Sequence, residues 1–377
     1  MKKETYLPLP DPLISDSGRR IGSAFEFFNI RRAEILDCFT REVYGALPPQ
    51  PEGFRIEMLQ ERADALGGAA LRREFRIVLE NGGSRFSFDV LAYFPHTEKP
   101  VPAIVALNFC GNAAAATEAD VLPVDAEHGT GADRWPFRQL IDDGVAVLTA
   151  ARNDVFFDDP ARRGDSVWRI FAPGCADDRS FTAISAWAGA CRWLLEAAMR
   201  FPEVDPRRIW VHGHSRLGKT ALWAAANEPR FAGVVSNDSG CMGASLCRDK
   251  GGESIRRIAS VFPHWFVEAF DRWGDREAEL PFDQHWLLAL AAPRPLLVAS
   301  ATEDEWADPR NEYRAAAAVG EVYRLFGAEG IGGAEFPAPD VPLMGDGVGY
   351  CLRTGKHGVM PIDWKFVTEF IRRSDGK

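Results

Sequence analysis

The first feature of the chain that could carry out a reaction is a serine close to two glycines. Ser215 lies in the segment 213–219, GHSRLGK, directly after the apolar run 209–211. A serine at a sharp turn between a strand and a helix can be the nucleophile of acyl transfer, and small residues must flank it. Here Leu217 takes the place of the usual second glycine and Gly218 follows it, so the G-x-S-x-G pattern is broken.

The same segment also satisfies the pattern of a phosphate-binding loop. Residues 213–220 fit G-x-x-x-x-G-K-T, after one apolar run and before a predicted helix. Asp238, which ends the later run 234–238, fits the magnesium-handling aspartate of such enzymes. The match to the sequence pattern alone therefore favours a P-loop NTPase over a serine hydrolase.

The remainder of the chain favours the hydrolase. A hydrolase places its acid and then its histidine after strands that follow the serine. The apolar run 295–300 leads into the acidic segment 301–309, ATEDEWADP, and His357 lies between glycines before an amphipathic helix at 364–371. A phosphate loop explains neither feature and would follow about 200 residues of other α/β structure, which is unusual. We expect Ser215 to act with His357 as base, and the backbone N–H of Arg216 to stabilise the oxyanion.

The elements that must position these residues follow an α/β pattern. Short apolar runs at 103–107, 145–148, 209–211, 233–235 and 295–298 predict parallel strands buried on both faces. Helical patterns at 184–199 and 220–226 separate them, which predicts a doubly wound, mostly parallel sheet in a three-layer sandwich. Runs at 73–79 and 86–94 around the turn Asn81-Gly82-Gly83 predict an antiparallel hairpin at one edge of the sheet. A further helix is expected over residues 30–44.

Length and composition limit the remaining possibilities. The 377 residues contain no repeat or linker, so we expect residues 1–50 to be an N-terminal extension packed on one catalytic domain, 51–377. The formal charge of −10 argues against nucleic acid as the main partner. No run is long and apolar enough to cross a membrane, and no secretory signal is visible, which predicts a cytoplasmic location, with secretion as the alternative if a signal has been trimmed away. Seven scattered cysteines predict buried free thiols.

At this point the sequence resembles carbohydrate esterase family 15, the glucuronoyl esterases, and in particular their bacterial members. The likeness covers about residues 25–372 and includes a serine segment with the same displaced glycine and following lysine. The matching segments are 31–36 (RRAEIL), 42–45 (EVYG), 107–109 (LNF), 184–188 (ISAWA), 213–219 (GHSRLGK), 236–240 (SNDSG), 262–266 (FPHWF), 292–295 (APRP) and 306–309 (WADP).

The resemblance implies an α/β-hydrolase fold and a serine esterase that hydrolyses alkyl or aryl esters of glucuronic acid. It places the triad acid at Asp304, with Asp238 as the alternative acid or a helper. It also implies that the side chain of Arg216 assists the oxyanion. The sugar hydroxyls would be bound by Lys219, Glu253 and Trp306. No metal or organic cofactor is implied.

Three alternatives stay open beside a glucuronoyl esterase. A sugar O-deacetylase of the acetylxylan type would use the sugar as the alcohol, whereas a glucuronoyl esterase uses it as the acyl group. A P-loop NTPase would bind ATP through Lys219, and a catalytically inactive binding protein would leave Ser215 unreactive. A cytoplasmic enzyme would not meet polymeric lignin–carbohydrate, so a small or oligosaccharide uronate ester is the expected substrate. The oligomeric state is not predicted.

Overall fold

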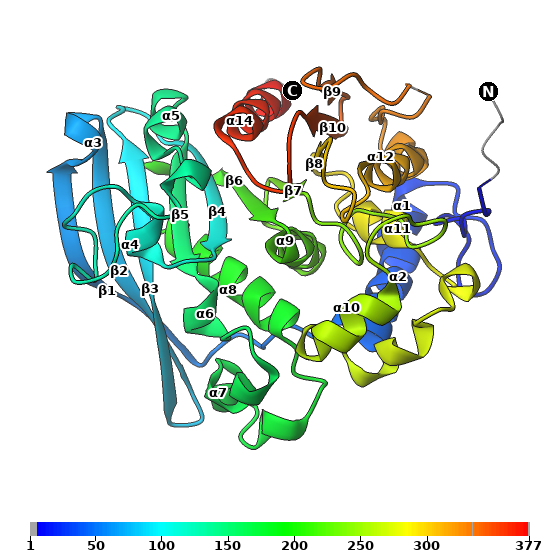
Figure 1. Cartoon of the computed structure of the whole chain (residues 1–377), viewed down its shortest axis with the longest axis horizontal. Coiled ribbons are helices and arrows are strands. Elements are labelled where there is room, and N and C mark those ends of the chain that lie inside the picture. Colours follow the sequence, from blue (N-terminus) through cyan, green and yellow to red (C-terminus); the bar gives the residue numbers. More distant parts are fainter. Residues whose placement is uncertain (1–5, 334, 376–377) are drawn as a thin grey trace.

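A single mixed sheet organises the protein (Figure 1). The computed structural model describes residues 6–333 and 335–375, and within them the sheet has ten strands. In their order across the sheet the strands are β1 (Gly53–Asp64), β2 (Ala70–Asn81), β3 (Ser84–Pro95), β5 (Ala146–Ala151), β4 (Val101–Asn108), β6 (Val204–His214), β7 (Gly233–Asn237), β8 (Leu296–Ala301), β10 (Val348–Arg353) and β9 (Leu343–Met344).

The centre of the sheet is parallel and its edges are antiparallel. The strands from β5 through β10 pair in parallel, and β2 and β3 form the predicted hairpin, with Asn81 opposite Ser84. β1 adds a further antiparallel strand outside that hairpin, so the hairpin itself is not the edge. All five predicted parallel strands are confirmed, while β1 and the last two strands were not predicted.

Helices cover both faces of the sheet, which confirms the predicted three layers (Figure 1). Along β4, Ala103 and Val105 belong to one apolar core, whereas Ile104 and Ala106 belong to the other. This alternation puts α8 and α9 on one face and α5 and α14 on the other. The helices are α1 (Ala24–Glu26), α2 (Arg32–Phe39), α3 (Ala65–Gly68), α4 (Asn112–Ala115), α5 (Phe137–Asp142), α6 (Arg152–Val155), α7 (Trp168–Phe171), α8 (Ala183–Ala198), α9 (Arg216–Asn227), α10 (Ile255–Val261), α11 (Gln284–Ala289), α12 (Pro309–Ala318), α13 (Gly320–Arg324) and α14 (Pro361–Asp375).

The predicted N-terminal helix exists, although two of its segments are π-helical, Phe27–Arg31 and Thr40–Tyr44. It ends at Gly45, whose φ of 74° favours glycine, and a Cβ there would lie 2.6 Å from the carbonyl oxygen of Ser180. Apolar side chains before and within this helix, such as Leu13, belong to the larger core. The division of the chain at residue 50 stays a prediction.

Two further expectations concern thiols and membranes. All seven cysteines are free, and five of them are buried. Cys38 is half-buried and Cys110 is exposed, so the prediction of burial is wrong for Cys110. Cys110 lies in the bend between the end of β4 at Asn108 and the start of α4 at Asn112. Among the helices of the described residues, none combines the length and apolarity that crossing a bilayer requires.

Candidate active site

Ser215 occupies a strained turn at the carboxyl end of β6. The strand ends at His214 and α9 begins at Arg216, so the serine is the single residue between them. Its φ of 57° and ψ of −127° are sparsely populated for any residue with a side chain. The turn is held by its backbone N–H, which donates to Asn237 O at 2.8 Å on the neighbouring strand β7. The geometry is that of a nucleophile elbow.

The glycines of the segment explain its irregular sequence. A Cβ on Gly213 would lie 1.8 Å from the carbonyl oxygen of Leu217, because the first turn of α9 folds back over the end of β6. A Cβ on Gly218 would lie 2.8 Å from the Cβ of Ser239. The glycine that lets α9 pack closely against Ser239 is therefore at position 218. Leu217 is instead a buried core residue.

The interpretation of residues 213–220 as a phosphate-binding loop is wrong. A phosphate loop needs several residues between strand and helix, whose N–H groups surround the phosphates. Here only Ser215 separates β6 from α9, and Lys219 lies inside the helix. The Lys219 ammonium donates to Ser239 O at 2.6 Å and is buried.

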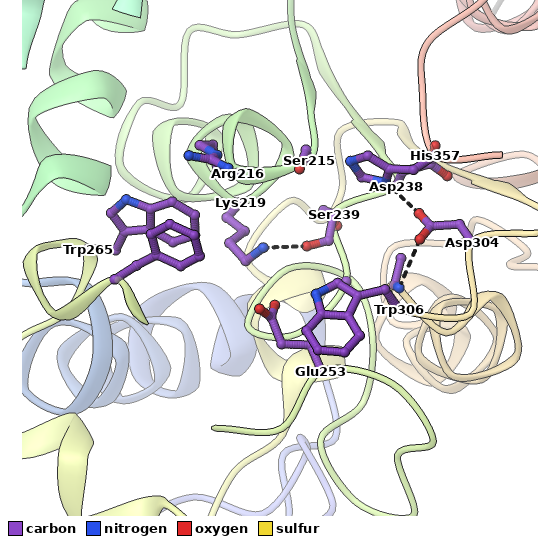
Figure 2. Close-up of a pocket in the computed structure, with 13 residues that line it drawn as sticks. Ser215, Arg216, Lys219, Asp238, Ser239, Glu253, Trp265, Asp304, Trp306 and His357 are labelled. Carbon is purple, nitrogen blue, oxygen red and sulfur yellow. Dashed lines mark hydrogen bonds and ion pairs between the residues drawn. The ribbon is translucent and has the colours of Figure 1, made fainter. Parts of the chain in front are cut away.

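His357 and Asp304 meet beside the serine. His357 follows β10 and lines the same pocket as Ser215 (Figure 2). Its Nδ1 lies 2.6 Å from Asp304 Oδ2, while Asp304 Oδ1 accepts from the backbone N–H of Ala307 at 3.2 Å. The carboxylate is thus fixed and nearly buried, whereas the imidazole side chain is 46% exposed toward the pocket and solvent. This arrangement orients an acid–base histidine.

Asp238 stands next to this pair but does not bind the imidazole. Its Oδ2 accepts from the backbone N–H of Gly358 at 3.1 Å and lies 3.6 Å from Arg353 Nη2. Burial and the nearby charge of Glu312 raise the pKa of Asp238 well above its usual range. The structure therefore gives Asp304 the contact expected of the triad acid, and Asp238 holds the loop that carries His357.

A second histidine packs beneath the proposed base. The ring centroids of His214 and His357 are 4.6 Å apart, and His214 Nδ1 lies 2.6 Å from Asn237 Oδ1. Burial, together with the neighbouring His357, holds the pKa of His214 well below its usual range. His214 is therefore a neutral packing group.

The N-terminus of α9 points a positive dipole at Ser215. The Arg216 N–H is the first of this twelve-residue helix, where the free N–H groups favour negative charge. The Arg216 side chain also lines the pocket, although its Nη1 donates to Asp158. The backbone N–H and the side chain of Arg216 are therefore the candidate donors to an oxyanion formed at Ser215.

The three predicted sugar-binding residues share the pocket, whose volume is about 360 Å³. Lys219 comes from α9, and Glu253 and Trp306 come from two loops joined by a hydrogen bond from Glu253 N to Trp306 O at 3.0 Å. Figure 2 shows Glu253 and the Trp306 indole close to the Lys219 ammonium. Lys219 and Glu253 are buried, and Trp306 is 56% exposed at the rim. Burial lowers the pKa of Lys219, and the charge of Glu253 opposes that effect.

No role was predicted for several other residues around the pocket. Trp265 lies across the pocket from Trp306 (Figure 2), and Phe262, which also lines the pocket, stacks on Trp265 with ring centroids 3.9 Å apart to form an aromatic wall. Asp158 binds Arg216 behind that wall. The segment 262–266 carried a family likeness, but no local signal distinguishes Asp158 from its acidic neighbours.

Glu312 of α12 is a buried carboxylate close to the triad. Its Oε1 accepts from Gly240 N at 2.9 Å and its Oε2 from Ser300 Oγ at 2.5 Å. Burial raises the pKa of Glu312 to about 7, from an ordinary value of 4.5. The folded protein thus favours the protonated form. The stability this group contributes is complete below pH 4.5 and is lost as the pH rises through 7.

We expect Glu312→Gln, which imitates the protonated carboxyl, to leave stability at pH 4.5 unchanged. At pH 8 it should raise the free energy of unfolding by about 3 kcal/mol, because the variant has no charge to bury. Urea unfolding at both pH values measures this. Glu228→Gln is the control, since ion pairs lower the pKa of Glu228 against the effect of burial. It should lose stability at pH 8, and a loss for Glu312→Gln at pH 8 would contradict the prediction.

Among the described residues, one group has the spacing of metal ligands: Asp238, Asp304 and His357, with ligand atoms within 4.8 Å of one another. Two of the three are already joined by the hydrogen bond between Asp304 and His357. The set therefore fits an acid–base relay, and we assign it no metal.

Comparisons with known proteins agree with this geometry. The family model for fungal glucuronyl esterases matches residues 77–327. A carbohydrate esterase of an unknown prokaryotic organism is 36% identical, over 96% of this chain and 88% of its own length. A 4-O-methyl-glucuronoyl methylesterase of Wolfiporia cocos is 26% identical, over 85% and 72% of the two chains. The solved glucuronoyl esterase of Solibacter usitatus superposes with a TM-score of 0.91 at 33% identity, over 99% of both chains.

Proposed function

The chain belongs to the glucuronoyl esterases, carbohydrate esterase family 15, and is a carboxylic ester hydrolase; we propose that it cleaves esters of glucuronic acid through an acyl-enzyme on Ser215. One observation carries the proposal. A serine on a strained elbow, a histidine bound to a buried aspartate, and a lysine–glutamate–tryptophan set all line a single pocket.

The first half of the reaction forms the acyl-enzyme. Ser215 Oγ attacks the ester carbonyl carbon while His357 Nε2 takes the hydroxyl proton. Asp304 accepts the Nδ1 hydrogen and thereby holds the tautomer whose Nε2 is free to act as base. The tetrahedral intermediate then breaks the bond to the alcohol oxygen, and His357 returns the proton to that oxygen. The alcohol leaves and the uronate stays on Ser215.

The second half repeats the same steps with water. His357 takes a proton from water, the hydroxide adds to the acyl carbon, and the bond to Ser215 Oγ breaks as the proton returns to the serine. In both halves the negative charge on the carbonyl oxygen is stabilised by the N–H and the guanidinium of Arg216. Preorganised donors of this kind contribute about 3–4 kcal/mol each to transition-state stabilisation.

The pocket residues Lys219, Glu253 and Trp306, which we call the polar set, favour a sugar acid as the acyl group of the substrate. Glu253 can accept hydrogen bonds from two adjacent ring hydroxyls, Lys219 can donate one, and the Trp306 indole offers an apolar face with one N–H donor. An acetyl group would make none of these hydrogen bonds, at a cost in binding. We infer that the uronate ring fills this side, while the alcohol departs past the exposed edge of His357.

Paired substrates test the proposal. We expect kcat/KM for benzyl or methyl glucuronate to exceed that for acetylated xylose at least 100-fold, because only the uronate engages the polar set. Initial rates on both substrates, with the galacturonate ester as a stereochemical control, measure the ratio. A preference for the acetyl ester would overturn the substrate assignment and favour an O-deacetylase.

A further inference from the structure

A buried cluster of charges lies directly behind the aromatic wall of the active site. Its centre is Asp158, three residues after α6, with a side chain that is only 8% exposed. Its Oδ1 accepts from His264 Nε2 and Trp265 Nε1, both at 2.7 Å. Its Oδ2 accepts from Arg216 Nη1 and lies 2.9 Å from Arg152 Nη1. Each oxygen therefore has two partners.

Such a carboxylate is a rigid, ionised anchor. Burial alone would raise the pKa of Asp158, but the bonds from His264 and Trp265 and the charges of Arg152 and Arg216 hold it well below its usual range. Without these contacts the carboxylate would be a buried charge without compensation, which is strongly unfavourable. The position of the carboxylate is thus fixed by partners from three separate segments of the chain.

The anchor holds a side chain that would otherwise be mobile. An arginine side chain has several rotatable bonds and loses rotamer entropy when it is held in one place. The Arg216 guanidinium carbon lies 4.6 Å from the ring centre of Trp265 and 5.1 Å from that of Phe262. The aromatic wall restricts the plane of the guanidinium, and Asp158 restricts its position along that wall.

Donors remain for the substrate after this anchoring. Asp158 uses only Nη1 of Arg216, and within the described part of the chain Nη2 has no hydrogen-bond partner; Nε also lacks one, but it is buried and does not face the pocket. The charges also leave a surplus, because Arg152 and Arg216 together carry two positive charges against one carboxylate. The cluster thus presents net positive charge beside Ser215.

We propose that Asp158 is a positioning residue for ester hydrolysis, which fixes the Arg216 guanidinium where it stabilises the oxyanion. This inference rests on the proposed function, since it assumes that Arg216 acts on the tetrahedral intermediate. Asp158 touches no reacting atom in this scheme. Its effect passes through Arg216, and the transition state, with its full negative charge, gains more from it than the neutral ester does.

Asp158→Asn tests the proposal. It keeps the size of the side chain but removes the charge that holds Arg216. We expect kcat on benzyl glucuronate to fall 10- to 100-fold while KM changes less than threefold. In an Arg216→Ala background the same substitution should lower kcat less than twofold, because the guanidinium that Asp158 positions is then absent. Glu228→Gln is the matched control, since this buried carboxylate pairs with Arg230 at the far end of α9 and should leave kcat unchanged.

Several outcomes separate the inference from the proposed function. An equal kcat loss in the parent and the Arg216→Ala backgrounds would overturn the positioning role while leaving the esterase intact. Absence of glucuronate ester hydrolysis by the parent protein would instead refute the proposed function. If Asp158→Asn does not fold, Trp265→Phe removes one donor to the same carboxylate and keeps an aromatic ring. It should lower kcat two- to fivefold, again only when Arg216 is present.

Discussion

Replacement of Ser215 by alanine is expected to lower kcat/KM for glucuronate esters by about 10⁴- to 10⁶-fold. The alanine variant cannot form the acyl-enzyme, and no other hydroxyl stands on the elbow between β6 and α9. The residual activity should come from the oxyanion donors and from substrate binding alone. Steady-state kinetics on benzyl glucuronate measure the loss.

Covalent labelling separates a catalytic serine from a structural one. A fluorophosphonate should label the parent protein at Ser215, and Ser215→Ala should remain unlabelled. Ser185→Ala is the control, because Ser185 is buried in α8, where its Oγ donates to Tyr44 O. It should keep both labelling and activity. A parent protein that resists the reagent would support a catalytically inactive binding protein.

The fold was largely predictable because its central strands are buried on both faces. Continuous apolar runs such as 103–107 are typical of parallel strands that helices cover on both sides. β1 was missed because it is an edge strand, in which residues such as Glu57 and Arg62 are partly or fully exposed and interrupt any apolar run. β10 was missed because its six buried residues include Gly349 and Arg353, which do not resemble a core strand.

The candidate site, like the fold, could be predicted from the sequence only in part. The nucleophile, the base and the acidic segment lie at the carboxyl ends of β6, β10 and β8, so their order along the chain predicts their meeting. Asp158 and His264 are 106 residues apart and meet through no such rule. Glu312 sits in a helix that reads as solvent-exposed, PRNEYRAAAA, and only the folded structure shows that it is buried.

The two aspartates near His357 should differ sharply when each is replaced by asparagine. Asp304→Asn should lower kcat by about 10³- to 10⁴-fold, because the 2.6 Å bond from His357 Nδ1 loses its charged acceptor and the tautomer is no longer fixed. Asp238→Asn should cost less than about tenfold, because its carboxylate supports Gly358 N and lies near Arg353 but does not bind the imidazole. Kinetics of both variants on benzyl glucuronate, with circular dichroism to verify folding, measure the difference.

A double variant tests why Asp304 and not Asp238 serves the histidine. The polar atoms of Asp238, Asp304 and His357 lie within 4.8 Å of one another. Asp238 is therefore correctly placed near the imidazole, and what it lacks is side-chain length. A glutamate at that position is one methylene longer. Asp238→Glu added to Asp304→Asn should therefore restore kcat at least tenfold over the single variant, whereas Asp238→Glu alone should give no gain. Should Asp238→Asn prove as damaging as Asp304→Asn, the two carboxylates would share the role of the acid, and the assignment to Asp304 alone would be wrong.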